Sequence, residues 1–157
     1  MNKEKLFKTI LETIRTKLQL AIDAVKMAHE SATHEENIAE SKYDTKGLEA
    51  SYLVQGQAKR AEELENALAV LNTMEIHPVN TVMLNALIEL EDQQGSKEFM
   101  FIAPASGGLK VEFENKEILL MTPASPLGKA LCGKTAGDET SVTIGRKHKE
   151  YKVLSVS

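Results

Sequence analysis

The distribution of proline and glycine divides this chain into two halves of different character. Residues 1–77 contain no proline and two glycines, whereas residues 78–157 contain all four prolines and seven of the nine glycines. Helix interiors tolerate both residues poorly, while turns between strands use both. The sequence therefore predicts a helical first domain over residues 1–77 and a second domain, residues 78–157, built from strands and turns.

The first half carries two apolar stripes at helical spacing. The stripes are Phe7, Ile10, Ile14, Leu18, Ala21, Val25 and Ala28, and then Leu48, Tyr52, Ala58, Ala61, Leu64, Leu68 and Leu71. They predict a first helix of about 27 residues and a second helix that ends near Met74. Neither helix would be stable alone in water, so we expect an antiparallel coiled-coil hairpin. Periodicity alone leaves a compact bundle or an intermolecular coiled coil open.

The segment Glu30–Glu40, between the two stripes, holds four carboxylates and no Lys or Arg. Thr33 and Glu36 fit a capping box in which Thr33 caps a helix that begins one residue later. Glu35 and Glu36 would then lie in the first helical turn, where negative charge suits the helix dipole. We therefore expect an acidic hairpin tip near residues 33–40.

In the second half the apolar period changes to two. Leu109, Val111 and Phe113 alternate with charged residues, which is typical of a strand with one buried face. Further strands are predicted over residues 82–90, 97–103, 116–121, 140–144 and 151–156.

One short helix is predicted among these strands, over Pro126–Cys132. Ser125 stands at its N-cap position and Gly133 just past its end, the usual start and stop signals. Cys132, beside an apolar residue on this helix, is expected to be buried. The second half is therefore predicted to be a small, mainly antiparallel sheet with one helix packed on it, which makes the chain α+β.

Composition limits the classes of function. The net charge of −4 argues against a general nucleic-acid binder. Aromatic content of 4%, with no Trp, argues against an aromatic-lined ligand pocket. A single cysteine excludes an internal disulfide, and the chain shows no signal peptide and no apolar run long enough to span a membrane. These features predict a soluble cytoplasmic protein.

Two segments resemble the bacterial GreA/GreB transcript cleavage factors. The first is Thr33–Asn37, THEEN, where the family's tip usually reads Asp-Leu-Ser-Glu-Asn. The second is Ser125–Lys134, SPLGKALCGK, which is similar to the family's Ser-Pro-x-(Ala/Gly)-(Arg/Lys)-(Ala/Gly)-Leu-(Leu/Ile)-Gly-Lys helix and is followed by Gly-Asp-Glu at Gly137–Glu139. In length and in the order of its parts, the resemblance covers nearly the whole chain.

The resemblance implies a fold and a mode of action. Such factors have an N-terminal coiled-coil hairpin and an FKBP-like C-terminal domain, which docks on the rim of the RNA polymerase secondary channel. The hairpin enters the channel, and tip carboxylates help to hold the second Mg²⁺ and to orient the water that cuts the 3′ end of backtracked RNA. The chain would thus be an accessory factor with no cofactor, free DNA binding or membrane contact of its own. The sequence leaves its oligomeric state open, and a monomer is our default expectation.

The resemblance also assigns roles to individual residues. Glu36 aligns with the tip glutamate and would share polymerase-bound Mg²⁺, and Glu35 and Asn37 are further catalytic candidates. Thr33 falls where the family has its tip aspartate; it can cap a helix but carries no charge. Partner contacts are expected from Thr33, His34, Glu40, Tyr43, Ser125 and Pro126.

Four functions stay open from the sequence. The first is stimulation of transcript cleavage, and the second is a non-cleaving regulator of the same channel that competes with cleavage factors or alters initiation. The uncharged Thr33 favours the second. A peptidyl-prolyl isomerase is suggested by the FKBP-like half, although the low aromatic content argues against it. The fourth is a coiled-coil adaptor unrelated to transcription.

Overall fold

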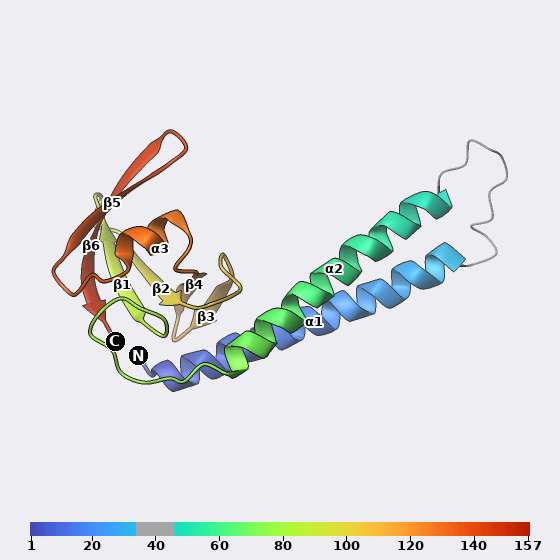
Figure 1. The fold of residues 1–157 in the computed structure, drawn as a ribbon, viewed down its shortest axis with the longest axis horizontal. Helices are drawn as coiled ribbons and strands as arrows, with labels where there is room; N and C mark the ends of the chain where they lie inside the picture. Colours follow the sequence, from blue (N-terminus) through green and yellow to red (C-terminus); the bar gives the residue numbers. More distant parts are fainter. Residues whose placement is uncertain (34–45) are drawn as a thin grey trace. The chain divides into compact units, whose positions relative to one another are not determined.

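The computed structural model describes residues 1–33 and 46–157 (Figure 1). Contacts divide the chain into two compact units. We name them the sheet unit, residues 1–11 and 69–157, and the hairpin unit, residues 12–68. Helix α1, Lys3–Thr33, and helix α2, Lys46–Asn72, each contribute residues to both units.

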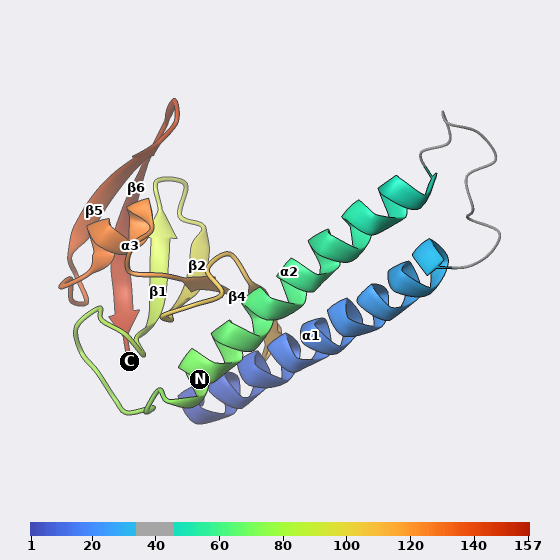
Figure 2. The same cartoon turned by 45° about the vertical axis from the view of Figure 1, so that its right-hand side comes forward.

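In the hairpin unit, α1 and α2 run antiparallel and side by side, as Figures 1 and 2 both show. The stripe predicted for α1 is confirmed here, since Ile14, Ala21 and Ala28 are buried. Among the α2 residues of this unit whose burial the structure describes, Leu64 and Ala67 are buried. The predicted helical hairpin is therefore present.

The predicted stripe of α2 is wrong in its first half. Leu48 and Tyr52 are 55% and 63% exposed, and the less exposed positions there are Val54 and Gln57. At 3.6 residues per turn, Tyr52 lies about 120° around the helix from Leu64. The pattern of apolar residues therefore predicts the wrong packing face for the first half of α2.

Helix α1 is longer than predicted, at 31 residues. Neither Gly nor Pro occurs between Ala28 and Thr33, so the helix continues through Thr33. Thr33 is the last residue that the structure assigns to α1, and its predicted role as the N-cap of a following helix stays a prediction. The predicted helix start at His34 lies outside the described residues.

The sheet unit contains a six-stranded sheet in the order β3-β4-β2-β1-β6-β5. The strands are β1 Leu87–Asp92, β2 Lys97–Ile102, β3 Lys110–Phe113, β4 Lys116–Met121, β5 Glu139–Ile144 and β6 Lys147–Val156. Neighbouring strands are antiparallel except β2 and β4, which are parallel. Helix α3, Pro126–Leu131, follows β4. The predicted α+β class and mainly antiparallel sheet are confirmed.

The first predicted strand starts too early. Residues 82–86 form a turn, and β1 begins only at Leu87. Asn85 has a positive φ of 76°, and its side-chain amide donates to the His77 carbonyl over 2.6 Å. Asn tolerates the left-handed region that this turn requires, which overrides the β propensity of its apolar neighbours.

The sheet packs on both of its faces. One face carries Ile88, Met100 and Val153, which pack with Leu127 and Leu131 of α3. Phe101 points to the opposite face, because side chains alternate along β2. Its fully buried ring lies 6.1 Å from that of Phe7, centroid to centroid.

The start of α1 is therefore part of the core of the sheet unit. Leu6, Phe7 and Ile10 are all buried, and residues 1–11 belong to this unit. Lys3 adds a polar contact, since its ammonium donates to the His77 carbonyl over 2.6 Å. The predicted division at residue 77 had placed these residues in the helical domain alone.

Candidate functional site

Most of the predicted tip residues lie outside the described part of the chain. They are His34, Glu35, Glu36, Asn37, Glu40 and Tyr43. Thr33 is placed only as the last residue of α1. The roles predicted for these residues, including a shared Mg²⁺ at Glu36, stay predictions.

Exposed apolar side chains flank the tip segment on both helices. Met27 on α1 is 68% exposed, and Leu48, Tyr52 and Leu53 on α2 are all more than half exposed. Sequence reasoning had assigned Leu48 and Tyr52 to the packed face and did not single out Met27. In the described residues of the free chain, these four side chains form the apolar surface closest in sequence to the acidic segment.

The start of α3 follows the predicted cap chemistry. The Ser125 backbone is extended, and its hydroxyl oxygen accepts from the Gly128 N–H over 3.0 Å. The same hydroxyl donates to the Thr122 carbonyl over 2.8 Å. Ser125 is thus engaged within its own loop, whereas Pro126, in the first helical turn, is exposed.

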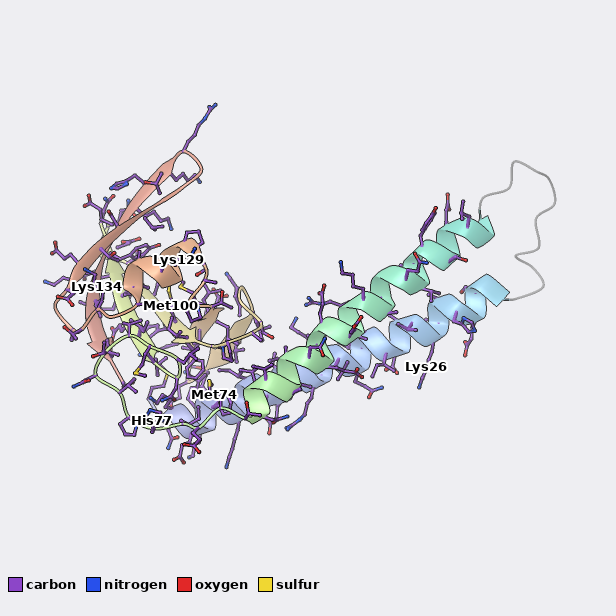
Figure 3. All side chains as sticks on the ribbon, in the orientation of Figure 1. Lys26, Met74, His77, Met100, Lys129 and Lys134 are labelled. Carbon is purple, nitrogen blue, oxygen red and sulfur yellow. The ribbon has the colours of Figure 1, made fainter. Side chains whose placement is uncertain are left out.

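Gly128 is required by the close packing of α3 on the preceding loop. A Cβ at this position would lie 2.1 Å from the Thr122 carbonyl oxygen and 2.8 Å from the Ser125 hydroxyl. Both are too close for a carbon atom. The exposed side of α3 carries Lys129, and Lys134 follows the helix (Figure 3).

Cys132 is exposed, so its predicted burial is wrong. Helix α3 ends at Leu131, and Cys132 leaves it with an extended backbone, φ −52° and ψ 131°. The buried side chains of the helix are instead Leu127 and Leu131. The thiol therefore lies just beyond the packed face.

An open groove of about 480 Å³ lies beside the start of α3. Its apolar lining includes Met100, Met121 and Leu127, and Ser125 and Pro126 form part of its wall. It is lined by residues from β2, β4, β6, α3 and the loops at Gly107 and Ser125, which are far apart in the sequence. The sequence alone could not predict that these residues line one groove.

Charged groups stand at the edge of this groove. The Lys149 ammonium donates to the Tyr151 hydroxyl over 3.3 Å and lies 3.9 Å from the Glu98 carboxylate. The hydrogen bond to Tyr151 and the negative charge of Glu98 raise the pKa of Lys149. Tyr151 is the single aromatic residue in the lining. The groove therefore lacks the aromatic walls expected of a prolyl isomerase.

A second hollow of about 460 Å³ is acidic. Glu91, Asp92, Glu139 and Glu150 contribute to its lining. Among the residues that the structure describes, no three His, Cys, Asp or Glu side chains are placed to hold a metal ion. In the same residues, no helix is long and apolar enough to cross a membrane.

The C-terminal half has a direct match among known families. The sequence model of the family described as "Transcription elongation factor, GreA/GreB, C-term" matches residues 77–157, just over half of the chain. This chain belongs to the GreA/GreB family. The predicted resemblance is thus confirmed, and the interpretation as an adaptor unrelated to transcription is wrong.

Relatives of two kinds match nearly the whole chain. It is 29% identical to the transcription inhibitor protein Gfh1 of Thermus aquaticus, over 98% of this chain and 90% of that protein. It is 26% identical to the transcription elongation factor GreA of Nitratidesulfovibrio vulgaris, over 94% of this chain and 86% of the relative. The crystal structure of Thermus aquaticus Gfh1 matches 98% of this chain and 92% of the other at 26% identity, with a TM-score of 0.38.

Membership of the GreA/GreB family places the chain among transcription factors and not among enzymes. The prediction of an accessory factor is therefore confirmed.

Proposed function

We propose that this protein binds RNA polymerase and inserts the tip of its hairpin unit into the secondary channel, where it stimulates cleavage of backtracked transcripts. The observation that carries the proposal is the antiparallel pair of α1 and α2 on either side of the acidic segment Glu30–Glu40. Family membership supports a role in transcription elongation.

The chemistry of the tip suits this role. Hydrolysis of a phosphodiester by two metal ions needs cations that stabilise the attacking and leaving oxygens. Mg²⁺ is typically bound by one or two carboxylates and keeps several waters, so a loosely held ion gains from a carboxylate supplied by another protein. Glu36 is our candidate for that carboxylate, with Glu35 and Asn37 positioning the reacting groups beside it.

The apolar side chains that flank the tip support insertion into a protein-walled channel. Met27, Leu48, Tyr52 and Leu53 expose large apolar surfaces to water in the free chain. Exposed apolar patches of this kind often mark contacts with other proteins. Channel walls would cover these side chains while the polar tip, with His34, Glu40 and Tyr43, reaches the active centre.

The groove beside α3 is the proposed docking site for the polymerase rim. Its lining is apolar at Met100, Met121 and Leu127, and Pro126 stands exposed at its edge. The Ser125 hydroxyl is committed to the helix cap. We therefore assign the direct contact to Pro126, and Ser125 positions it.

A non-cleaving regulator is the second candidate function. Two observations favour it: Thr33 carries no charge where the family usually has an aspartate, and Gfh1, a transcription inhibitor, matches the chain over almost its full length. Such a factor would occupy the same channel without supplying a complete set of acids.

A transcript cleavage assay separates the two candidates. The protein is added to a backtracked elongation complex with Mg²⁺, and shortening of the labelled RNA is followed in time. For a cleavage factor, Glu36→Ala reduces the rate on the order of 10- to 100-fold. Glu65→Ala, which removes an exposed carboxylate from the middle of α2, leaves the rate unchanged.

Three further outcomes test the choice of function, polymerase binding and the docking site. If wild type leaves the RNA intact but Thr33→Asp shortens it, the protein is a non-cleaving regulator. Absence of binding to the polymerase, measured by co-elution on a sizing column, overturns both candidates. If Pro126→Asp binds as well as wild type, the groove is not the docking site.

A further inference from the structure

Strands β5 and β6 extend as a two-stranded ribbon beyond the rest of the sheet. They pair with each other from Glu139 opposite Lys152 to Ile144 opposite Lys147. The pairing of β6 with β1, in contrast, ends where Tyr151 meets Asp92. Residues 141–150, which we name the β ribbon, therefore have no strand on their other side, and Figures 1 and 2 show them projecting from the sheet unit.

The tip of the β ribbon is basic in an otherwise acidic protein. Gly145, with a positive φ of 62°, and Arg146 form its two-residue turn, and Lys147 and Lys149 follow on β6. Lys147 and Lys149 point to the same face, about 7 Å apart along the strand. The chain as a whole has a net charge of −4.

Two of these three cations have no partner in the structure. Lys149 is engaged by Glu98 and Tyr151, and the nearby Glu150 carboxylate lies 3.5 Å from His148. Within residues 1–33 and 46–157, no ion pair or hydrogen bond is made by the side chain of Arg146 or Lys147. Both side chains are exposed and available to an anion.

We propose that the β ribbon contacts the sugar–phosphate backbone of a nucleic acid strand. Phosphates are contacted mainly by Arg and Lys, and also by Ser and Thr. The β ribbon presents Arg146 and Lys147 at its tip, whereas exposed Ser141 and Thr143 lie on the face opposite to Lys147.

An acidic protein surface fits the β ribbon less well. The cores of protein interfaces are enriched in aromatic residues, Met and Arg, and depleted in Lys and Ser. Among the β-ribbon residues whose side-chain exposure the structure describes, none is an exposed large hydrophobic residue. The exposed side chains described there are polar or charged, and Arg146 and Lys147 among them suit a phosphate contact.

Because the contact is between cations and phosphates, its affinity should fall as the salt concentration rises. Two neutralised phosphates, one each at Arg146 and Lys147, give a slope of log affinity against log salt of about −1.4 for a single strand. Binding of a short fluorescent single-stranded RNA, measured by anisotropy, should weaken about 25-fold between about 20 mM and about 200 mM salt. With Arg146→Ser/Lys147→Ser, both contacts are lost and the remaining binding should be weak and nearly independent of salt.

A matched variant controls for net charge. Lys110→Ser/Lys116→Ser removes two exposed lysines from the opposite edge of the sheet and should leave the salt slope as in wild type. Circular dichroism confirms that both double variants are folded. Polymerase is absent from this assay, so its outcome does not depend on the proposed function.

Three results would overturn the proposal. The first is no RNA binding by wild type at about 20 mM salt, where counterion release favours binding most strongly. The second is an equal loss of slope in the two double variants, which shows that only net charge matters. The third is displacement of the RNA by a poly-glutamate peptide that binds at Arg146 and Lys147 at least as tightly as a labelled RNA of equal charge. In that case the partner of the β ribbon is an acidic protein segment.

Discussion

Replacing Phe7 by Ala should destabilise the sheet unit, although Phe7 belongs to a helix that the sequence assigned to another domain. The Phe7 side chain is only 8% exposed, and its ring lies 6.1 Å from that of Phe101, which is fully buried in the sheet. Truncation removes the burial of one ring and leaves a cavity beside the other.

The expected loss follows from the size of the buried side chain. Phe→Ala substitutions in well-packed cores cost about 3–5 kcal/mol of unfolding free energy. For a chain of this length each kcal/mol lowers the melting temperature by about 2–4 °C, so we expect a decrease of roughly 6–20 °C. Phe7→Leu keeps most of the apolar volume and should cost no more than about 1.5 kcal/mol. Thermal unfolding followed by circular dichroism measures both.

Leu20→Ala is the matched control on the same helix. Leu20 is 63% exposed, and surface substitutions of this kind change stability by no more than about 0.5 kcal/mol. If Phe7→Ala and Leu20→Ala lower the melting temperature equally, the first turns of α1 do not form part of the core of the sheet unit. The assignment of residues 1–11 to that unit would then be wrong.

Two further predictions concern single positions. Gly128→Ala should lower the unfolding free energy by about 1–3 kcal/mol, because the added Cβ would meet a backbone oxygen. Gly56→Ala, in open space on α2, should raise the unfolding free energy by about 0.5–1 kcal/mol. Equal midpoints of urea unfolding for the two variants would refute this. Hydrogen bonds from the backbone and side chain of Thr135 lower the pKa of Asp138 below its ordinary value of 3.8. Because the folded state favours the ionised carboxylate, its stabilising effect is complete above that value and is lost as the pH falls through the lower folded pKa. The stability difference between wild type and Asp138→Ala, measured by urea unfolding, should therefore be largest near neutral pH and shrink below pH 3.8; a difference that is constant down to strongly acidic pH contradicts this.

The local signals in the sequence were sufficient for the elements of the sheet unit. Strand β3 and the start of α3 lie where the alternation around Val111 and the Ser125-Pro126 pair predict them. These signals act over a few residues, since a cap hydroxyl and its acceptor are neighbours along the chain. The exposure of Cys132 was missed because the helix ends one residue earlier than its pattern suggests.

The groove proposed for docking could be predicted only in part. Ser125 and Pro126 were identified from their motif, but Met100, Tyr151 and Lys149 were not connected with them. Those residues come from β2 and β6, which meet α3 only when the sheet is assembled. A motif within one segment cannot reveal side chains that other segments contribute.

By itself the sequence determined the α+β class, two long helices in the first half, the acidic character of the segment between them and the family. These properties depend on residue type and short-range periodicity. The tertiary structure decided that Tyr52 is exposed, that Phe7 packs against Phe101 and that the β ribbon extends past its neighbour. Each of these depends on contacts between segments that are far apart in the sequence. Whether a residue is buried is set by those contacts and not by its residue type alone.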